Sequence, residues 1–532
     1  MINTLLQRAV ALHNAGDTAQ AMALYRRVLA FEPGNADAQH LLGLLVRREG
    51  RVEDGVAMLA RALRLVPQLE PAILNHGLML LQLGRLDAAA ESFRRKLALE
   101  PVCVSSLYRL GTNALSLGRP GEAARLLRVA LDLDTDRGPM LPLLRRGVER
   151  CATMREIAAD SLDPSLPMGL VLRGVFRDSS GYALVVRRFA RGLTEAGIPV
   201  RLVDLNYEDS DNLADGQFDP LLATLNRPVR AKAVLTISTP LAVERVPGLK
   251  SIVYTMFEAC GIPPIWAAHS RRHDHVIVAT DSSRQAWLRA GHPPDRIHIT
   301  PAGVEALEPD RVRCADIVDQ AGRRFTDFRV RVLNVSDLNT RKNLDGLLRV
   351  WLRATRAEDS AALLLKLGKG RGVFGDVRDL LTRVQNETGR TLTETAPIFL
   401  VEGKLSDAEM MTLHAASSHY WSMSHGEGWD LPMAQAGAMG LTLLAPDHSA
   451  YRAYLDGDVA HLIPSSVEPA TGGYAGQDWW TPDEAAACRL LRGILDDPDG
   501  TRRSAQAHLR ERMTWEAATR RLIALLRDLD AL

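Results

Sequence analysis

The chain has 532 residues, of which 46% are hydrophobic and 24% are charged, a balance typical of a globular protein of several domains. Its 65 Lys and Arg residues against 64 Asp and Glu residues leave a net charge of +1, which gives no sign of nucleic acid as a partner. Its five cysteines fit neither a zinc motif nor a disulfide framework, and no apolar stretch suits a transmembrane segment or a signal peptide, so we expect a cytoplasmic protein.

The first 137 residues contain a repeat of 34 positions. Within each unit, a small residue lets two helices approach and a bulky residue four positions later fills the gap. A glycine allows the tight turn between the helices, and a proline ends the second helix. The pattern resembles tetratricopeptide repeats, so we expect an α-helical solenoid of four units over residues 1–137, with Thr135 in place of the last proline. The repeated residues are Gly16, Gly50, Gly84 and Gly118; Ala21, Gly55, Ala89 and Ala123; Tyr25, Leu59, Phe93 and Leu127; and Pro33, Pro67 and Pro101.

The first helices of such repeats form a concave face that commonly binds a peptide or protein. Helical spacing predicts that the partner-binding residues on this face include His40, Arg47, Arg48 and Tyr108. The alternative is that they are solvated helix residues and that the groove packs only against the rest of the chain. Some repeat-bearing sugar transferases carry a ladder of asparagines here, which this sequence lacks, so that mode of recognition is not expected. The equivalent positions are Gln7, Leu41, Asn75 and Arg109.

Residues 138–168 contain several prolines and are expected to form a linker, after which short apolar runs alternate with amphipathic helical stretches. This alternation predicts βαβ units and two doubly wound α/β domains that face a cleft, with ligands bound at the carboxyl ends of the strands. The first series of strands is expected at 170–176, 200–205, 233–237, 251–256 and 275–279, and the second at 331–335, 361–367, 397–401, 419–423 and 442–445.

Two motifs in the second series can carry chemistry. In SMSHGEGWDLPMAQAGAMG, from Ser422 to Gly440, a strand end and a glycine-rich turn with Glu427 precede a helix that begins near Pro432. The free N–H groups of a helix start suit a diphosphate. In VLNVSDLNTRKN, a strand ends and a loop delivers Arg341 and Lys342 to the same cleft, where two cations can stabilise a departing diphosphate.

With these motifs, residues from about 169 to 525 resemble a GT-B fold glycosyltransferase of family 4, the retaining class that uses nucleotide sugars. The family pattern Ser-x-x-Glu-Gly-Phe-Gly-Leu-Pro-x-x-Glu-Ala is matched at Ser424, Glu427, Gly428, Trp429, Leu431 and Pro432. Further agreement comes from the RKN string, from RDSSGYALVVRRFARGLTEAG, from YTMFE and from PAGVE. The resemblance implies an N-terminal acceptor-side domain at 169–310, a donor domain at 325–505 and a closing helix at 506–532.

The resemblance also implies roles for individual residues. Arg341 and Lys342 would hold the diphosphate and Glu427 the transferred sugar, which makes these three the expected catalytic residues. No cofactor and no metal are expected. The Asp-x-Asp string at Asp209 and Asp211 is a metal motif of another glycosyltransferase class, but the same spacing occurs elsewhere in this chain and is therefore not specific. The expected donor-binding residues are Gly181, Glu258, Lys366, Gly428, Leu431 and Gln435.

Two positions depart from the family pattern. Gln435 replaces the second glutamate, which contacts the nucleotide ribose in the family, and so loses a charge-assisted bond. Asp430 replaces a glycine and brings a carboxylate near the diphosphate unless its side chain points away.

Taken together, the sequence predicts a glycosyltransferase that uses a nucleoside diphosphate sugar and recruits a protein acceptor or partner through its repeats. Two alternatives stay open: an interaction scaffold whose transferase domain has lost turnover through Gln435 and Asp430, and a transferase that acts on a lipid-linked glycan or polysaccharide.

Overall fold

The computed structural model describes residues 2–134, 138–205, 219–242, 244–306, 314–319, 321–368, 371–372 and 375–532. The chain forms two compact units. Unit 1 consists of Met1–Pro164, Pro240–Lys250 and Pro264–Arg272, and unit 2 consists of Ser165–Thr239, Ser251–Pro263 and His273–Leu532.

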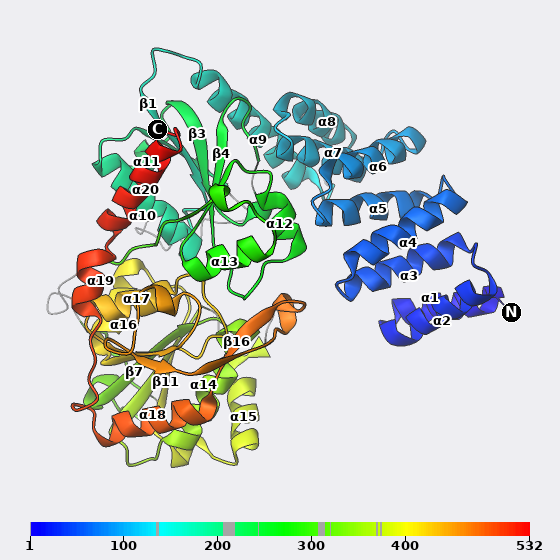
Figure 1. Ribbon diagram of the computed structural model, residues 1–532. Coiled ribbons are helices and arrows are strands. Elements are labelled where there is room, and N and C mark those ends of the chain that lie inside the picture. Colours follow the sequence, from blue (N-terminus) through cyan, green and yellow to red (C-terminus); the bar gives the residue numbers. More distant parts are fainter. Residues whose placement is uncertain are drawn as a thin grey trace. The chain divides into compact units, whose positions relative to one another are not determined.

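Unit 1 is built from helices that follow one another as antiparallel pairs (Figure 1). The four turns within the pairs each contain a glycine with positive φ, between 67° and 85°, which is the backbone conformation that glycine adopts without strain. The repeat predicted from the sequence is therefore present as four pairs. The helices are α1 (Ile2–Asn14), α2 (Thr18–Phe31), α3 (Ala36–Arg48), α4 (Val52–Leu65), α5 (Glu70–Gln82), α6 (Leu86–Leu99), α7 (Val104–Ser116) and α8 (Pro120–Leu133).

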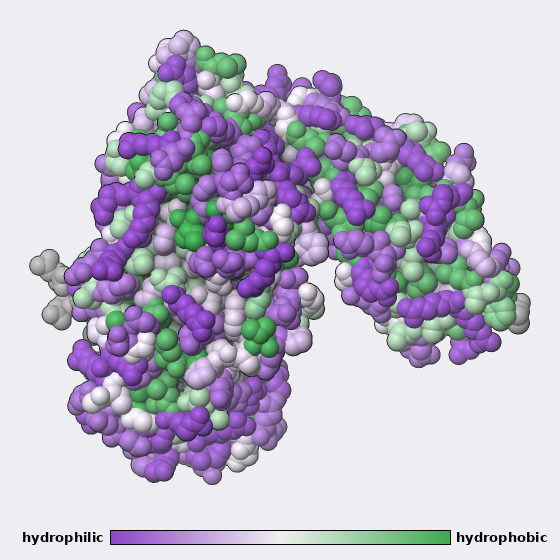
Figure 2. All heavy atoms as spheres, in the orientation of Figure 1, coloured by the Kyte–Doolittle hydropathy of each residue, from purple (hydrophilic) through white to green (hydrophobic). Residues whose placement is uncertain are grey.

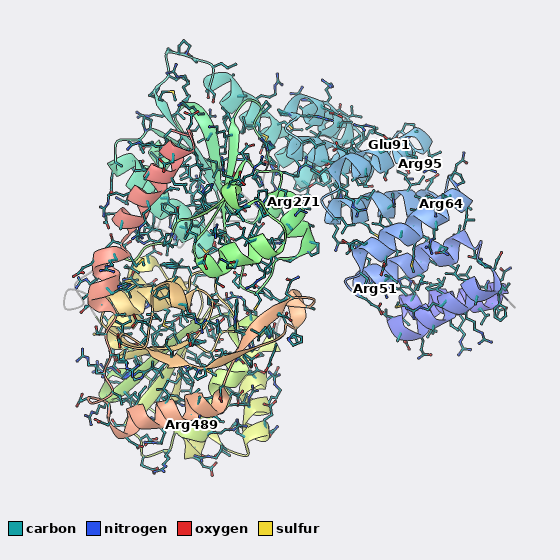
Figure 3. All side chains as sticks on the ribbon, in the orientation of Figure 1. Arg51, Arg64, Glu91, Arg95, Arg271 and Arg489 are labelled. Carbon is teal, nitrogen blue, oxygen red and sulfur yellow. The ribbon has the colours of Figure 1, made fainter. Side chains whose placement is uncertain are left out.

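The small and bulky residues of each repeat meet inside the helix pairs, as their spacing predicts. Gly77 of α5 lies against the ring of Phe93 of α6, and Phe93 is fully buried. Charged side chains cover the outside of the pairs: Figure 3 labels Arg51 and Arg64 at the two ends of α4, and both are exposed. In Figure 2 the visible surface of these helices is mainly hydrophilic, with hydrophobic residues interspersed.

Replacing Gly77 by alanine tests this packing. The new Cβ would lie 2.7 Å from an atom of the Phe93 ring, so we expect a loss of about 1 to 3 kcal/mol from local overpacking. Gly121→Ala in α8 is the matched control, because a Cβ there meets nothing within 4 Å and alanine favours the helix by up to about 1 kcal/mol. Hydrogen exchange of α5 and α6 in the full chain measures both; equal protection in the two variants would contradict the prediction.

The segment expected to be a linker contains α9 (Leu141–Asp160), a helix of 20 residues that packs against α8 within unit 1. Gly147 of α9 lies against Leu127 of α8, and Cys151 is buried. Two further segments complete the unit with the turn η1 (Pro240–Ala242) and the short helix α12 (Pro264–Ser270). The loop that contains Gly84 packs against Ala268 of α12, a contact that the repeat pattern does not predict.

The first sheet of unit 2 is parallel and has six strands in the order β2-β1-β3-β4-β5-β6. The chain runs from β1 outward to β2 and then returns to the other side of β1, so a topological switch point lies between β1 and β3. The elements are β1 (Met168–Gly174), α10 (Gly181–Glu195), β2 (Val200–Asp204), α11 (Pro220–Thr224), β3 (Arg230–Ile237), β4 (Lys250–Thr255), β5 (His275–Val278), α13 (Asp281–Arg289), η2 (Pro294–Arg296) and β6 (Ile297–Ile299).

The second sheet is parallel with the order β11-β8-β7-β12-β13-β14, and its switch point lies between β7 and β12. The main elements are β7 (Val330–Ser336), α14 (Leu344–Ala354), β8 (Ala361–Leu367), α15 (Val377–Thr388), β11 (Ile398–Glu402), α16 (Asp407–Ala416), β12 (His419–Trp421), α17 (Leu431–Ala438), β13 (Thr442–Pro446), β14 (His461–Ile463) and α18 (Glu484–Asp496). Shorter elements are η4 (Phe325–Asp327), η5 (Thr340–Lys342), β9 (Arg371–Gly372), β10 (Gly375–Asp376), η6 (Leu392–Glu394) and η7 (Tyr451–Ala453).

Helices cover both faces of this second sheet (Figure 1). Every residue of β8 is buried, as a parallel strand inside an α/β layer requires. Leu363 and Leu365 belong to the core shared with α14, α15 and α18, whereas Leu364 belongs to the core shared with α16 and α17.

Three elements outside the sheets shape unit 2. A hairpin of β15 (Ser465–Pro469) and β16 (Asp478–Pro482) carries the turn η8 (Gly472–Tyr474) at its tip. After α19 (Gln506–Arg512), the last helix α20 (Trp515–Asp528) packs on α10 of the first sheet, where the Trp515 and Phe189 rings lie 5.7 Å apart between centroids. The C-terminal helix therefore packs on the same half of unit 2 as the first strands.

Candidate functional site

The loop after β7 presents two cations at the switch point of the second sheet. Asn339 caps the turn η5 by accepting a bond from the Lys342 N–H, 3.0 Å away. Asn343 has φ 48°, the left-handed conformation that asparagine tolerates, and donates to the Met423 carbonyl, 3.0 Å away. These two asparagines fix the backbone on either side of Arg341 and Lys342.

Both cations pair with one carboxylate from the loop after β12, on the other side of the switch point. Arg341 Nη1 lies 2.8 Å from Glu427 Oε2, and Lys342 Nζ lies 2.8 Å from Glu427 Oε1. Glu427 is only 6% exposed. Burial alone would raise the pKa of the Glu427 carboxyl. The charges of Arg341 and Lys342 outweigh burial and lower this pKa to about 2. The three residues expected to be catalytic are thus brought together as one buried ion triad.

The helix that follows begins at a residue with unusual geometry. Asp430 has φ 57° and caps α17, because its Oδ1 accepts the Met433 N–H at 3.2 Å. Its Oδ2 accepts a bond from the Tyr451 hydroxyl at 2.8 Å, and Tyr451 also bonds Ser422. The side chain of Asp430 is therefore held within its own domain, in a left-handed conformation that a glycine would also adopt.

The Asp430 carboxyl gives a pH dependence that can be measured. Burial and the charge of Glu427 raise the pKa of Asp430 to about 6. A raised pKa means that the folded chain prefers the protonated acid, so this group contributes its full stability below the pKa of the unfolded chain, at about 4, and has lost it once the pH has risen through about 6. Asp430→Asn keeps the cap and the left-handed backbone without the titration. We expect the free energy of unfolding of the wild type, relative to that of this variant, to fall by about 1 to 2 kcal/mol between about pH 5 and pH 7.5. Urea denaturation at each pH measures it, and a difference between the two proteins that does not change with pH would contradict the prediction.

Two helix N-termini face each other at the site. A Cβ placed on Gly181, the first residue of α10, would lie 3.6 Å from Leu431, the first residue of α17. Gly428 lies against Met256, which follows β4 of the first sheet. The structure therefore brings Gly181, Gly428 and Leu431 together with the ion triad.

Gln435 lies one turn further along α17 and makes two hydrogen bonds across unit 2. Its Oε1 accepts the Glu305 N–H at 2.8 Å, and its Nε2 donates to the Glu305 carbonyl at 3.1 Å. Gln435 is 7% exposed. Both polar groups of the Gln435 side chain, which was expected to bind the donor, are thus taken by the main chain of the segment after β6.

Glu258 approaches the triad from the first sheet, and its partner is a residue that sequence reasoning missed. Its Oε2 accepts a bond from the Tyr474 hydroxyl, 2.9 Å away, at the tip of the β15–β16 hairpin. The charge of Glu258 also helps to raise the pKa of Arg341. The only sequence signal for Tyr474 was its place in a glycine-rich stretch between two apolar segments, TGGYAGQDWW.

Lys366 lies at the end of β8 and points into the protein. Its Nζ donates to the carbonyls of Leu367 at 3.0 Å and Gly403 at 2.6 Å, and burial lowers its pKa. The structure places Lys366 at the carboxyl edge of the sheet without a contact to the triad among the described residues.

In unit 1 the residues expected to bind a partner differ in exposure. His40 is 6% exposed and lies 3.0 Å from Asn75 Nδ2, and burial lowers its pKa. Arg47 is half-buried and donates to Gln82 at 2.9 Å, whereas Arg48 is exposed. The half-buried ring of Tyr108 lies under the guanidinium of Arg109. Arg47, Arg48 and Tyr108 thus have surface to offer, while His40 is already engaged.

The described ranges contain no cluster of three or more histidine, cysteine, aspartate or glutamate residues that could hold a metal. Asp209 and Asp211, which we discounted as a metal motif, lie outside the described residues. Among the helices of the described part, none is long and apolar enough to cross a membrane.

Solved structures similar to this chain include three sugar-related proteins. The HepE protein of Anabaena, in complex with UDP and glucose, is 14% identical, with 68% of this chain and 100% of that chain covered and a TM-score of 0.48. Sucrose-phosphate synthase of Thermosynechococcus elongatus is 16% identical, with 68% and 99% covered and a TM-score of 0.48. A mutant O-GlcNAc transferase of Thermobaculum terrenum is 15% identical, with 99% and 96% covered and a TM-score of 0.40. No curated protein matches the sequence of this chain.

Two family models match the N-terminal part of the chain, and both describe the tetratricopeptide repeat. One matches residues 12–75 and the other residues 74–137, which together cover the helix pairs from the end of α1 to α8. The matches agree with the spacing of 34 and with the turn glycines of positive φ. Residues 12–137 of this chain are therefore tetratricopeptide repeats.

Proposed function

We propose that this chain is a retaining glycosyltransferase that moves a sugar from a nucleoside diphosphate sugar to an acceptor hydroxyl. The observation that carries the proposal is the pairing of Arg341 and Lys342 with the buried Glu427 at the switch point of a parallel sheet. Loops at a switch point are where open α/β sheets bind their ligands. Two adjacent cations at such a point suit a diphosphate.

In the proposed mechanism, the diphosphate of the donor takes Arg341 and Lys342 as partners and the N-terminus of α17 faces its oxygens. The bond between the anomeric carbon and the diphosphate oxygen breaks, and the two cations stabilise the charge that develops on the leaving group. The acceptor hydroxyl attacks the same face and its proton passes to the departing diphosphate. Glu427, released from part of its ion pairing, accepts bonds from hydroxyls of the sugar.

The remaining donor contacts are proposed from position. Gly181 leaves room for a ligand to approach the backbone of α10, because a Cβ there would make one ordinary contact, with Leu431. The Met256 side chain fills the space beside Gly428, so at Gly428 we propose a contact through the backbone N–H only. Glu258, oriented by Tyr474, lies on the side of the first sheet. Lys366 lies at the carboxyl edge of β8, where a lysine can reach the nucleotide only if it leaves the carbonyls that it now contacts. The proposal requires no metal, because the cations supply the positive charge.

The repeats are proposed to recruit a protein acceptor or partner through Arg47, Arg48 and Tyr108, with His40 and Asn75 fixing the helices behind them. A glycan or lipid-linked acceptor would leave this surface to a companion enzyme.

A second candidate function is an interaction scaffold, and one observation favours it. Glu427 neutralises both cations, and Gln435 is occupied by the main chain of Glu305, so the site is internally satisfied. A scaffold of this kind would bind no nucleotide.

The experiment that separates the two is thermal unfolding with UDP, GDP, ADP, dTDP and their sugar conjugates. We expect one nucleotide family, at about 100 times its dissociation constant, to stabilise the wild type by about 2.7 kcal/mol. Lys342→Ala should abolish this shift, whereas Lys232→Ala, which removes an exposed lysine of β3 paired with Asp530, should preserve it. No shift with any nucleotide would sink the transferase proposal and favour the scaffold.

A further inference from the structure

Gln435 and Glu305 form a pair that joins the two halves of unit 2. Gln435 belongs to α17, on the second sheet, and Glu305 follows β6, the last strand of the first sheet. The amide of Gln435 accepts from the N–H and donates to the carbonyl of the same residue, at 2.8 Å and 3.1 Å. This doubly bonded contact, which we call the 435–305 latch, satisfies both polar groups of the side chain at a buried position.

The latch requires an amide. An ionised glutamate at position 435 has no donor, so its carboxylate would face the Glu305 carbonyl with no hydrogen between two acceptors. Buried polar groups left without partners are costly, and a carboxylate against a carbonyl adds repulsion. Glutamine at this position therefore makes a pair of hydrogen bonds that an ionised glutamate cannot make.

A second set of contacts joins the same elements. The Glu305 carboxylate lies 2.8 Å from Arg188 Nε, on α10. Arg188 and Arg187 approach the carboxylate of Asp407, the first residue of α16, at 3.6 Å and 3.5 Å. The segment after β6 is therefore tied to α10 on its own half and to α17 on the other, and α10 is itself paired with α16.

We propose that Gln435 is a positioning residue, which through the 435–305 latch sets the separation of the two helix N-termini at Gly181 and Leu431. The latch also withholds the Gln435 amide from any ligand, so recognition of a nucleotide ribose falls to other groups. Only this last consequence rests on the proposed function; the latch itself is a property of the ligand-free chain.

Hydrogen exchange in the full chain without ligand tests the latch directly, because the Glu305 N–H is one of its donors. Gln435→Met removes both bonds at similar volume, and we expect the amide of residue 305 to lose at least about tenfold of its protection at every pH. Gln435→Glu should lose less protection than Gln435→Met at about pH 7.5, because its carboxylate still accepts the Glu305 N–H while it repels the Glu305 carbonyl. It should regain protection near pH 5, where a protonated carboxyl again has one donor and one acceptor. The wild type should stay protected throughout.

The groups that titrate or carry charge around the latch are common to all these variants, so Gln435→Met provides the baseline for each pH. They are Arg188 and Arg191 of α10, Asp407 and His414 of α16, Arg510 of α19, Glu516 of α20 and Asp430 at the start of α17. Glu305→Ala is a second control, since it keeps the main-chain groups that Gln435 contacts and should keep the protection of residue 305.

Two results would overturn the proposal: unchanged protection of residue 305 in Gln435→Met, or the absence of any pH recovery in Gln435→Glu relative to Gln435→Met. Nucleotide binding has no part in these measurements. A latch that passes them while no nucleotide stabilises the chain would leave the positioning role intact and remove the transferase proposal alone.

Discussion

Glu427→Ala is expected to lower the free energy of unfolding of unit 2 by about 3 to 5 kcal/mol, and at the same time to strengthen the binding of inorganic pyrophosphate. The stability loss follows because two largely buried cations, Arg341 and Lys342, lose the carboxylate that lies 2.8 Å from each. In the part of the chain that the structure describes, neither cation has another acidic partner within ion-pair distance. The gain in pyrophosphate affinity follows because the anion no longer competes with Glu427.

The matched control for this change is Glu484→Ala. Glu484 also bridges two cations, Arg349 at 2.6 Å and Arg353 at 3.0 Å, but its side chain is 26% exposed and it begins α18, away from the switch point. An ion pair open to water contributes little, so we expect a loss of no more than about 1 kcal/mol and no effect on pyrophosphate. Urea denaturation and calorimetric titration measure both quantities.

The two outcomes separate the roles within the triad. Lys342→Ala should weaken pyrophosphate binding, whereas Glu427→Ala should strengthen it and still abolish sugar transfer. If Glu427→Ala destabilised the chain no more than Glu484→Ala, or bound pyrophosphate less tightly than the wild type, the triad would not be the diphosphate site.

Much of the fold could be predicted from the sequence because its residue patterns are periodic. The repeat of 34 with a glycine at each turn could hardly form anything but helix pairs, and the apolar runs mark ten of the twelve strands of the two large sheets to within a few residues. The run at 361–367, for example, is strand β8 with the same bounds. Strands β6 and β14, of three residues each, were not predicted, whereas β12, which is equally short, was found because the run at 419–423 extends beyond it.

The site could be predicted only where its residues form a local sequence motif. Arg341, Lys342 and Glu427 stand at strand ends beside turn residues, and the order of the strands brings them to one switch point. The partners of Gln435 are main-chain groups 130 residues away, which any residue but proline would supply at position 305, so no residue pattern predicts the contact. The same holds for Tyr474, which depends on where a hairpin tip falls.

Asp430 occupies a backbone position that usually requires glycine. The sequence left open whether its carboxylate would face a diphosphate. Its φ of 57° is the conformation for which a glycine is usually chosen, and its two oxygens are taken by the Met433 N–H and the Tyr451 hydroxyl. Because an aspartate can both adopt this backbone and cap the helix, the departure from glycine costs less than the sequence alone suggests.

Gly426→Ala is expected to separate the two halves of unit 2 at the site. A Cβ at Gly426 would overlap the carbonyl oxygen of Glu258, which is main chain and cannot rotate away. The loop after β4 would have to retreat, and with it the bond from Tyr474 to Glu258 and the main-chain bond from the Cys260 N–H to the Asp478 carbonyl. We expect a loss of about 3 kcal/mol, at the upper end of ordinary overpacking.

A comparison with other glycines makes this prediction specific. Gly428→Ala places its Cβ 2.6 Å from the Cβ of Met256, which moves only with its own main chain, so this variant should also lose stability. Its effect should be smaller than that of Gly426→Ala, because the overlap is smaller and involves no carbonyl oxygen. Gly473→Ala, at the exposed hairpin tip, meets nothing within 4 Å and should be neutral. Denaturation curves and hydrogen exchange of the segment 256–260 measure the stability loss of each of the three variants and so rank them. The Gly426 carbonyl also accepts a bond from Arg341 at 2.6 Å, so among these variants only Gly426→Ala should lower the affinity for pyrophosphate. If Gly426→Ala lost stability but bound pyrophosphate as the wild type does, the anion would bind away from this loop.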